Sequence, residues 1–200
     1  MLVVIDSGVS NLASVGKAFA AHTSVEVSSN PSVVSRASRL VLPGVGSFDS
    51  AIQLLRNKSG LLDAIYESVL GRSRPILGIC LGAQLLLDGS DEGRESGLGL
   101  IPGRAKALHV SPEVKVPHTG WNSVEVVQES PLTAGEEDWR FYFVHSFAPY
   151  PNDPNSILGF TDHGGLFPSI IGKGNVFGVQ FHPEKSYRFG AALIRNFLKV

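Results

Sequence analysis

Short apolar runs alternate with amphipathic stretches in the first half of this chain. Apolar runs of strand length lie at residues 2–5, 24–27, 40–42 and 75–79. Between them, apolar positions recur three and four residues apart, which predicts helices at residues 11–22, 48–55, 61–70 and 81–87. Strand followed by helix, repeated, is typical of a parallel sheet covered by helices on both faces. Ligands bind such sheets beyond the carboxyl ends of the strands.

The second half has a different, β-rich pattern that begins near residue 105. Pro, Asn, Gly and Asp separate expected strands at residues 114–116, 123–127, 140–144, 157–161, 169–171 and 176–181. Apolar residues four apart then predict a final amphipathic helix over residues 187–200. We expect one α/β domain over residues 1–200, with three layers. Its mostly parallel central sheet is flanked by helices, and the C-terminal half adds an antiparallel β portion. A mobile loop is expected at residues 89–103, which are rich in glycine and charge.

Composition narrows the classes of function. The chain has 200 residues, of which 43% are hydrophobic and 18% charged, as expected for a single well-cored domain. With 17 basic and 18 acidic residues its formal net charge is -1, which gives no electrostatic basis for binding nucleic acid or an anionic membrane. Its apolar runs are too short for a spanning helix.

The cysteine content and the first residues favour the cytoplasm. Residues 1–6 lack a basic leader and are typical of a first core strand. One cysteine cannot form an internal disulfide, which fits a reducing compartment. Cysteine and histidine do not cluster at zinc spacing. We therefore expect a cytoplasmic protein with no metal and no cofactor.

That single cysteine, Cys80, stands in Gly-Ile-Cys-Leu-Gly between an apolar run and a helix-like segment. A strand that turns sharply into a helix exposes the residue at the turn and favours a thiolate there. The alternative is that a lone cysteine is a small buried apolar residue. The flanking glycines favour the nucleophile, which then needs a base elsewhere in the chain.

A candidate base lies near the other end of the chain, in Gln-Phe-His-Pro-Glu. In an extended segment, residues two apart project to the same side, so the carboxylate of Glu184 can hold one ring nitrogen of His182. The other nitrogen can then accept the thiol proton. Pro183 favours an extended conformation at His182. The alternative is a histidine at a strand end and a glutamate on a solvated loop, but beside Cys80 we predict a Cys/His/Glu triad.

Acyl transfer also needs backbone N–H groups aimed at the oxygen that becomes negative. The apolar run at residues 40–42 leads into Pro-Gly-Val-Gly, a turn whose amides can approach a substrate. Most Gly-x-Gly segments are simply turns. Its place after a strand favours Val45 or Gly46 as one donor, and the amide of Leu81 is the natural second.

Together these motifs resemble the class I glutamine amidotransferases over the whole chain and in the expected order. Further segments resemble the glutaminase subunits of imidazole glycerol phosphate synthase, an enzyme of histidine biosynthesis. These segments are Asp-x-Gly-x-x-Asn at 6–11, Val-Pro-His-Thr-Gly-Trp-Asn at 116–122, Tyr-Phe-Val-His-Ser-Phe at 142–147 and Pro-Glu-Lys-Ser at 183–186. Related glutaminases do not usually share the Trp-Asn segment. Ala83 departs from the pattern, since methionine often stands there, and this change concerns packing and not chemistry.

The resemblance implies hydrolysis of L-glutamine to glutamate and ammonia. Cys80 would attack the amide carbon, His182 would move the proton and Glu184 would orient the ring. The resemblance also assigns the residues that bind glutamine: Gly46, Gln84 and the backbones of Ser146 and Phe147.

The resemblance further implies a heterodimer with a (β/α)8-barrel cyclase. That partner would use the ammonia to make imidazole glycerol phosphate and aminoimidazole carboxamide ribotide. We expect the docking face to include Asn11, Trp121 and Lys185, because each stands beside a motif at the mouth of the site. For Trp121 the alternative is a core anchor.

Three other functions are compatible with the same candidate residues. The chain could act alone as a cysteine peptidase or gamma-glutamyl hydrolase, supply ammonia to a paralogous pathway, or be an inactive binding subunit. Of the remaining histidines, His118 and His145 are expected to be hydrogen-bonded structural groups, and His163 a surface residue. Acidic residues at 91, 92 and 95 are expected to form a solvated loop.

Overall fold

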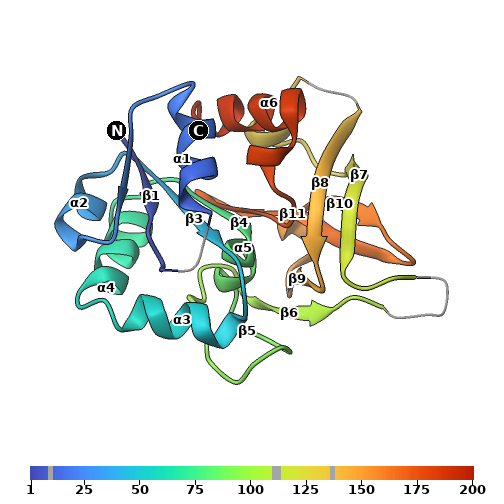
Figure 1. Cartoon of the computed structure of the whole chain (residues 1–200), viewed down its shortest axis with the longest axis horizontal. Helices are drawn as coiled ribbons and strands as arrows, with labels where there is room; N and C mark the ends of the chain where they lie inside the picture. Colours follow the sequence, from blue (N-terminus) through green and yellow to red (C-terminus); the bar gives the residue numbers. More distant parts are fainter. Residues whose placement is uncertain (9–10, 110–113, 136–137) are drawn as a thin grey trace.

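A computed structural model describes residues 1–8, 11–109, 114–135 and 138–200 (Figure 1). Its main sheet has nine strands in the order β2-β1-β3-β4-β12-β11-β10-β7-β8. The parallel strands are β1 (Leu2–Ile5), β2 (Val25–Ser28), β3 (Arg39–Gly44), β4 (Ile76–Cys80) and β12 (Val176–Val179). The antiparallel strands are β11 (Leu166–Lys173), β10 (Ile157–Asp162), β7 (His118–Val126) and β8 (Trp139–His145).

Helices cover both faces of the parallel part of the sheet (Figure 1). One face carries α1 (Leu12–Ala20) and α6 (Tyr187–Phe197), and the other carries α2 (Pro31–Arg36), α3 (Phe48–Arg56), α4 (Leu61–Tyr66) and α5 (Leu81–Leu85). A second sheet of three strands contains β5 (Gly89–Ser90), β6 (Gly103–Ala107) and β9 (Phe147–Pro151). Among the described residues, no helix has the length and apolar character needed to cross a bilayer.

Alternating side chains in the parallel strands feed two separate cores. In β1, Val3 and Ile5 pack into the core under α2, α3 and α4, whereas Leu2 and Val4 pack into the core under α1 and α6. All four side chains are 0–1% exposed. A strand buried on both faces therefore appears in the sequence as an unbroken apolar run, the pattern from which a parallel sheet was predicted.

The predicted fold class is confirmed: the chain is α/β, with parallel strands in its N-terminal half and antiparallel strands in its C-terminal half. Among the α-helices and strands, four are missing from the prediction, namely α2, β5, β6 and β9. Asn30 and Pro31 carried the signal for α2, since the Asn30 side chain accepts a bond from the Ser32 amide and Pro31 opens the helix.

Three other expectations differ from the structure, in whole or in part. The strand expected at residues 114–116 does not form, and β7 begins at His118, directly after Pro117, which has no N–H for a sheet ladder. The helix expected over residues 61–70 changes at Glu67 into a π-helical turn that extends to Gly71. The segment expected as a loop at 89–103 contains β5 and is bonded to α3, as described below.

Candidate active site

Cys80 lies at a sharp turn between β4 and α5. Its φ of 56° and ψ of -115° are unusual for a residue with a side chain. Glycines make the turn: a Cβ at Gly82 would overlap the Leu42 carbonyl oxygen, and one at Gly78 would lie 2.6 Å from the Gly82 oxygen. The backbone of α5 thus packs directly against β3 and β4, and this close approach fixes the position of the sulfur.

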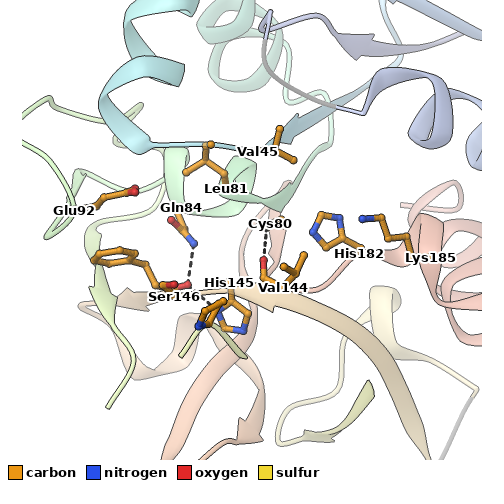
Figure 2. Close-up of a pocket in the computed structure, with 13 residues that line it drawn as sticks. Val45, Cys80, Leu81, Gln84, Glu92, Val144, His145, Ser146, His182 and Lys185 are labelled. Carbon is orange, nitrogen blue, oxygen red and sulfur yellow. Dashed lines mark hydrogen bonds between the residues drawn. The ribbon is translucent and has the colours of Figure 1, made fainter. Parts of the chain in front are cut away.

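The thiol is 7% exposed and borders a cavity of about 430 Å³. Its Sγ lies 3.9 Å from the carbonyl oxygen of Val144 and 3.7 Å from Nε2 of Gln180. The cavity is lined by residues from both halves of the fold, including His182 and Lys185 (Figure 2). Residues separated by about half the chain therefore meet at one site.

His182 and Glu184 form a buried pair beside the sulfur. His182 Nδ1 lies 2.8 Å from Glu184 Oε1, and the two side chains are 4% and 2% exposed. The backbone is extended only at His182, because residues Pro183–Lys185 form a 3-10 turn. The contact was predicted, but the turn and not a continuous strand produces it.

This pairing controls the protonation of the imidazole. Burial acts to lower the pKa of His182, but its interactions with Cys80 and then Glu184 outweigh burial and raise it to about 9. In the described part of the chain, His182 Nε2 has no partner in good hydrogen-bond geometry. Nδ1 is thus bonded to Glu184, and Nε2 remains available to accept or donate a proton.

Ser186 holds the loop that carries His182. Its hydroxyl donates to the His182 carbonyl at 2.6 Å and accepts from the Tyr142 amide at 3.0 Å. The His182 amide in turn donates to the Tyr142 carbonyl at 2.9 Å. Ser186 is fully buried and bridges the histidine loop to β8. In the sequence it was noted only as the last letter of Pro-Glu-Lys-Ser.

The expected oxyanion and glutamine-binding residues all line this cavity: Val45, Gly46, Leu81, Gln84, Ser146 and Phe147. Gln84 Nε2 donates to the Phe147 carbonyl and to Gln180 Oε1, both at 2.9 Å. Gln180, which sequence reasoning missed, is fully buried and joins Gln84 to Cys80. No pattern in the sequence distinguished it from an ordinary strand residue.

Two of the expected backbone contacts are already engaged within the chain. The Ser146 carbonyl accepts from the Leu108 amide at 2.9 Å. The Phe147 carbonyl accepts from Gln84 and also from His145 Nδ1 at 2.9 Å. These two oxygens therefore shape the cavity wall, and a substrate would meet other backbone groups of this segment.

A hydrogen-bonded chain of neutral histidines stands behind that wall. Because His145 Nδ1 donates to the Phe147 carbonyl, its Nε2 is the acceptor for His118 Nδ1, 3.0 Å away. His118 Nε2 then accepts from Asn122 Nδ2 at 3.2 Å. Burial lowers the pKa of His118 to about 4 and that of His145 to about 3. His163 stacks on His118 with ring centres 4.0 Å apart.

Asp91 and Glu92 are exposed, as expected for a solvated acidic loop, but Glu92 also has a place in the site. Its side chain lines the cavity opposite His182 (Figure 2). Its Oε2 also accepts from the Phe48 amide at 2.9 Å, at the start of α3. One carboxylate oxygen is thus fixed by the helix, and the group presents negative charge to the cavity. No group of three or more His, Cys, Asp or Glu side chains in the described ranges is arranged to hold a metal ion.

The three residues expected at a docking face lie apart from the core. Trp121 is 43% exposed, which excludes the core-anchor alternative, and it stacks on exposed Tyr187 with ring centres 5.6 Å apart. Lys185 borders the cavity, with its Nζ 5.7 Å from the centre of the Tyr142 ring. Asn11 is exposed and caps α1 by accepting from the Ser14 amide. It does not line the cavity.

Comparison with known proteins gives a match over nearly the whole chain. Residues 3–200 match the model of the family described as glutamine amidotransferase class-I. The chain is 44% identical to imidazole glycerol phosphate synthase subunit HisH 2 of Pseudomonas aeruginosa, over 100% of both chains. It is 41% identical to the subunit of the same name from Methanococcus maripaludis, over 100% of this chain and 99% of that one.

Solved structures share the fold at lower identity. A crystal structure of a glutamine amidotransferase gives a TM-score of 0.75 at 19% identity, covering 98% of this chain and 97% of that one. The glutaminase domain of Trypanosoma brucei CTPS with bound acivicin gives 0.68 at 14% identity, covering 99% and 93%. At these identities the likeness concerns the fold alone.

Proposed function

This chain belongs to the class I glutamine amidotransferases, in the family of glutaminase subunits of imidazole glycerol phosphate synthase, and from that premise we propose that Cys80, His182 and Glu184 hydrolyse L-glutamine. We further propose that residues 1–200 form one glutaminase domain. The observation that carries the assignment is the buried His182–Glu184 pair beside a cysteine at a sharp strand-to-helix turn. A nucleophile, a base and a group that orients the base are thereby held together.

In the proposed reaction, Cys80 gives its thiol proton to His182, and Sγ attacks the side-chain amide carbon of glutamine to form a tetrahedral intermediate. Its collapse breaks the carbon–nitrogen bond, and His182 gives its proton to the leaving nitrogen, so that ammonia departs and a thioester remains. The raised pKa of His182 supports this step, because the imidazole holds a proton at neutral pH. Water then attacks the thioester, His182 takes its proton, and glutamate leaves while the thiol is restored.

Backbone amides at the end of β3 and the start of α5 are the proposed oxyanion donors. Leu81 follows the nucleophile directly, and Val45 and Gly46 line the same cavity. Gly46 has a φ of 89°, and the position of its missing Cβ is open, with no atom within 4 Å among the described residues. A substrate could therefore approach this backbone closely.

The cavity wall supports an amino acid as the substrate. Gly46 and Gln84 would contact glutamine along its length, and backbone groups of Ser146 and Phe147 its amino-acid end. Glu92 adds a carboxylate that suits an α-ammonium group.

The proposed partner is a (β/α)8-barrel cyclase that uses the ammonia in histidine biosynthesis and forms imidazole glycerol phosphate and aminoimidazole carboxamide ribotide. Both sequence relatives are described as subunits of imidazole glycerol phosphate synthase, which supports a partner. We place the interface at Asn11, Trp121 and Lys185. Exposure of the stacked Trp121 and Tyr187 rings supports this choice. We place the complex in the cytoplasm, where a single free cysteine is stable.

The test measures glutamate release by the purified chain, alone and with the candidate cyclase and its substrate. We expect the cyclase to stimulate turnover, Cys80→Ser to abolish it, and a glutamine-analogue alkylating reagent to label Cys80. Turnover by Cys80→Ser above a trace would contradict the nucleophile. Full activity without the cyclase, or on larger glutamyl substrates, would favour a hydrolase that acts alone. Stimulation by another ammonia acceptor instead would favour a paralogous pathway.

A further inference from the structure

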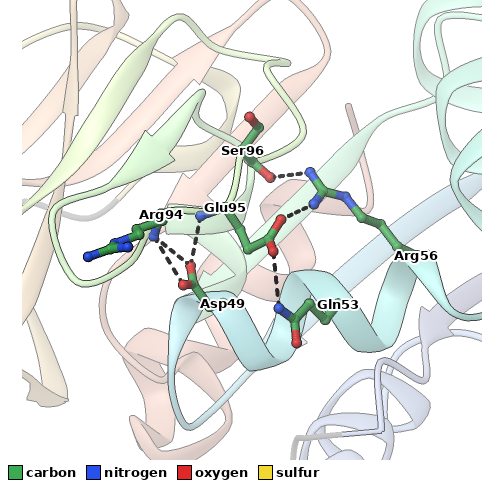
Figure 3. Close-up of polar contacts among 6 residues, drawn as sticks. All are labelled: Asp49, Gln53, Arg56, Arg94, Glu95 and Ser96. Atoms are coloured by element: carbon green, nitrogen blue, oxygen red, sulfur yellow. Dashed lines mark hydrogen bonds and ion pairs between the residues drawn. The ribbon is translucent and has the colours of Figure 1, made fainter.

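The segment that carries Glu92 is bonded to one face of α3 along most of the helix (Figure 3). Asp49, Gln53 and Arg56 are spaced four and three residues apart, so they lie on one side of the helix. All three contact residues 94–96, which follow Glu92. We call this set of contacts the α3 strap.

Asp49 makes the part of the strap nearest to the cavity. Its carboxylate accepts from the Arg94 amide, at 3.1 Å to Oδ1 and 3.0 Å to Oδ2, and from the Glu95 amide at 3.0 Å. These amides, that of Arg94 first, lower the pKa of Asp49. A Cβ at Gly93 would overlap the Asp49 carboxylate, so only glycine lets the turn approach so closely.

The remaining contacts of the strap are made by the longer side chains of Gln53 and Arg56, which are more exposed. Gln53 Nε2 donates to Glu95 Oε1 at 3.0 Å, and Arg56 forms an ion pair with Glu95 and donates to the Ser96 carbonyl at 2.8 Å. Exposed ion pairs contribute little to stability. Asp49 bonds instead to two backbone amides, and it therefore determines the path of the turn itself.

The turn at residues 92–95 and the first turn of α3 are joined by hydrogen bonds in both directions. Ser47, the residue before the helix, makes no side-chain cap, and Glu92 takes that role by accepting from the Phe48 amide at 2.9 Å. Asp49 in the first turn of α3 binds the amides that follow Glu92. The helix begins two residues after Gly46, in the proposed oxyanion turn. Glu92 and the oxyanion turn are thus joined to the same helix end.

We propose that Asp49 is a positioning residue for the amino-acid end of glutamine, and that it acts by holding the Glu92 carboxylate at the cavity wall. This inference rests on the proposed glutaminase function. Glu92 Oε2 stays on the Phe48 amide, so Oε1 is the oxygen available to a substrate ammonium group. Without Asp49, the Arg94 and Glu95 amides lose their bonds to α3, and Glu92 spends less time in the binding position.

The experiment compares Asp49→Ala with Asp63→Ala in complex with the candidate cyclase. Asp63 is the matched control, an exposed aspartate in the first turn of the neighbouring α4. For Asp49→Ala we expect the KM for glutamine to rise about tenfold while kcat changes less than about twofold, because loss of a charge-assisted contact to bound substrate affects binding. Asp49→Asn keeps one acceptor oxygen and should fall between Asp49→Ala and the wild type.

Two further readouts separate positioning from a general loss of structure. Trypsin should cleave after Arg94 faster in Asp49→Ala than in Asp63→Ala, with the remaining sites unchanged. The double variant Asp49→Ala/Glu92→Gln should have about the KM of Glu92→Gln alone, since Asp49 acts through Glu92. Additive effects on KM, an unchanged KM in Asp49→Ala, or a loss confined to kcat would each overturn the proposal while leaving glutaminase activity established. If the wild-type complex hydrolyses no glutamine, the proposed function fails, and this role fails with it.

Discussion

Acid should destabilise the fold through His145, and His145→Asn should remove the contribution of this residue. His145 Nδ1 donates to the Phe147 carbonyl, so its Nε2 accepts from His118. A proton added to Nε2 would place two N–H groups face to face in a buried site. The network therefore requires a neutral ring.

The size of the effect follows from the pKa. Burial lowers the pKa of His145 from 6.5 to about 3, against a smaller opposing effect of its bond to the Phe147 carbonyl. Below pH 6.5 the unfolded chain binds a proton at this residue and the folded chain does not, so the free energy of unfolding falls as pH falls. Between about pH 7 and pH 5 the loss is about 2 kcal/mol. Because the pKa of His145 in the folded chain lies below this pH range, the loss depends only on its ordinary pKa of 6.5 in the unfolded chain.

Asparagine is the informative replacement because its Nδ2–H can still donate to the Phe147 carbonyl. The variant leaves the His118 N–H without an acceptor, so it should lose about 1–3 kcal/mol at neutral pH. Its further loss on acidification should be smaller than that of the wild type by about 2 kcal/mol. Urea unfolding followed by tryptophan fluorescence at both pH values measures this difference. The matched control is His22→Asn, at an exposed histidine outside the network. An unchanged pH dependence in His145→Asn would refute the reasoning.

Three other substitutions test separate parts of the site. Gln180→Leu removes the amide beside the sulfur. It should lower kcat/KM for glutamine about tenfold in glutamate-release assays, a loss of about 1.4 kcal/mol of transition-state stabilisation. Unchanged kinetics would show that the contact is incidental. Ser186→Ala leaves the Tyr142 amide without its acceptor, whereas the His182 carbonyl keeps its bond from the Lys185 amide. The free energy of unfolding in urea should therefore fall by about 1–3 kcal/mol, and an unchanged free energy of unfolding would contradict the bridge. Gly82→Ala places a methyl group on the Leu42 carbonyl oxygen. The variant should therefore fail to fold to a soluble product. A soluble variant with the wild-type melting temperature would contradict the close packing of the turn.

Features encoded within a few residues were predictable from the sequence. Glycines on both sides of Cys80 indicate a sharp turn whatever surrounds it. The spacing of His182 and Glu184 allows only a short distance between their side chains. The unbroken apolar run of β1 likewise reports burial on both faces. In each case local geometry limits the structure before any tertiary contact forms.

The missed residues depend on contacts far apart in the chain. Gln180 reaches a sulfur 100 positions away, and Glu92 lines the cavity in a segment whose next residues, Arg94 and Glu95, are bonded to Asp49 on α3. A polar residue in a strand or an acidic residue in a loop has no local signature for such a role. Short segments such as β6 and β9 were missed for the same reason, since neither has a clear strand pattern of its own and each is a strand because it pairs with the other.

The position of the site follows from one pairing in the sheet. β12 lies beside β4 and runs parallel to it, with Val179 opposite Ile79, so the carboxyl ends of both strands reach the same edge. Cys80 is the last residue of β4, and the chain continues from the end of β12 to His182, although Cys80 and His182 are 102 positions apart in sequence. Here the parallel half of the sheet meets the antiparallel half, because β12 pairs with β11 on its other side. A one-residue slip would send alternate side chains of β12 to the opposite face. Gly178 opposes this slip: a Cβ at that position would lie 3.0 Å from the Ala83 methyl group, so no bulkier residue fits against α5 in its place.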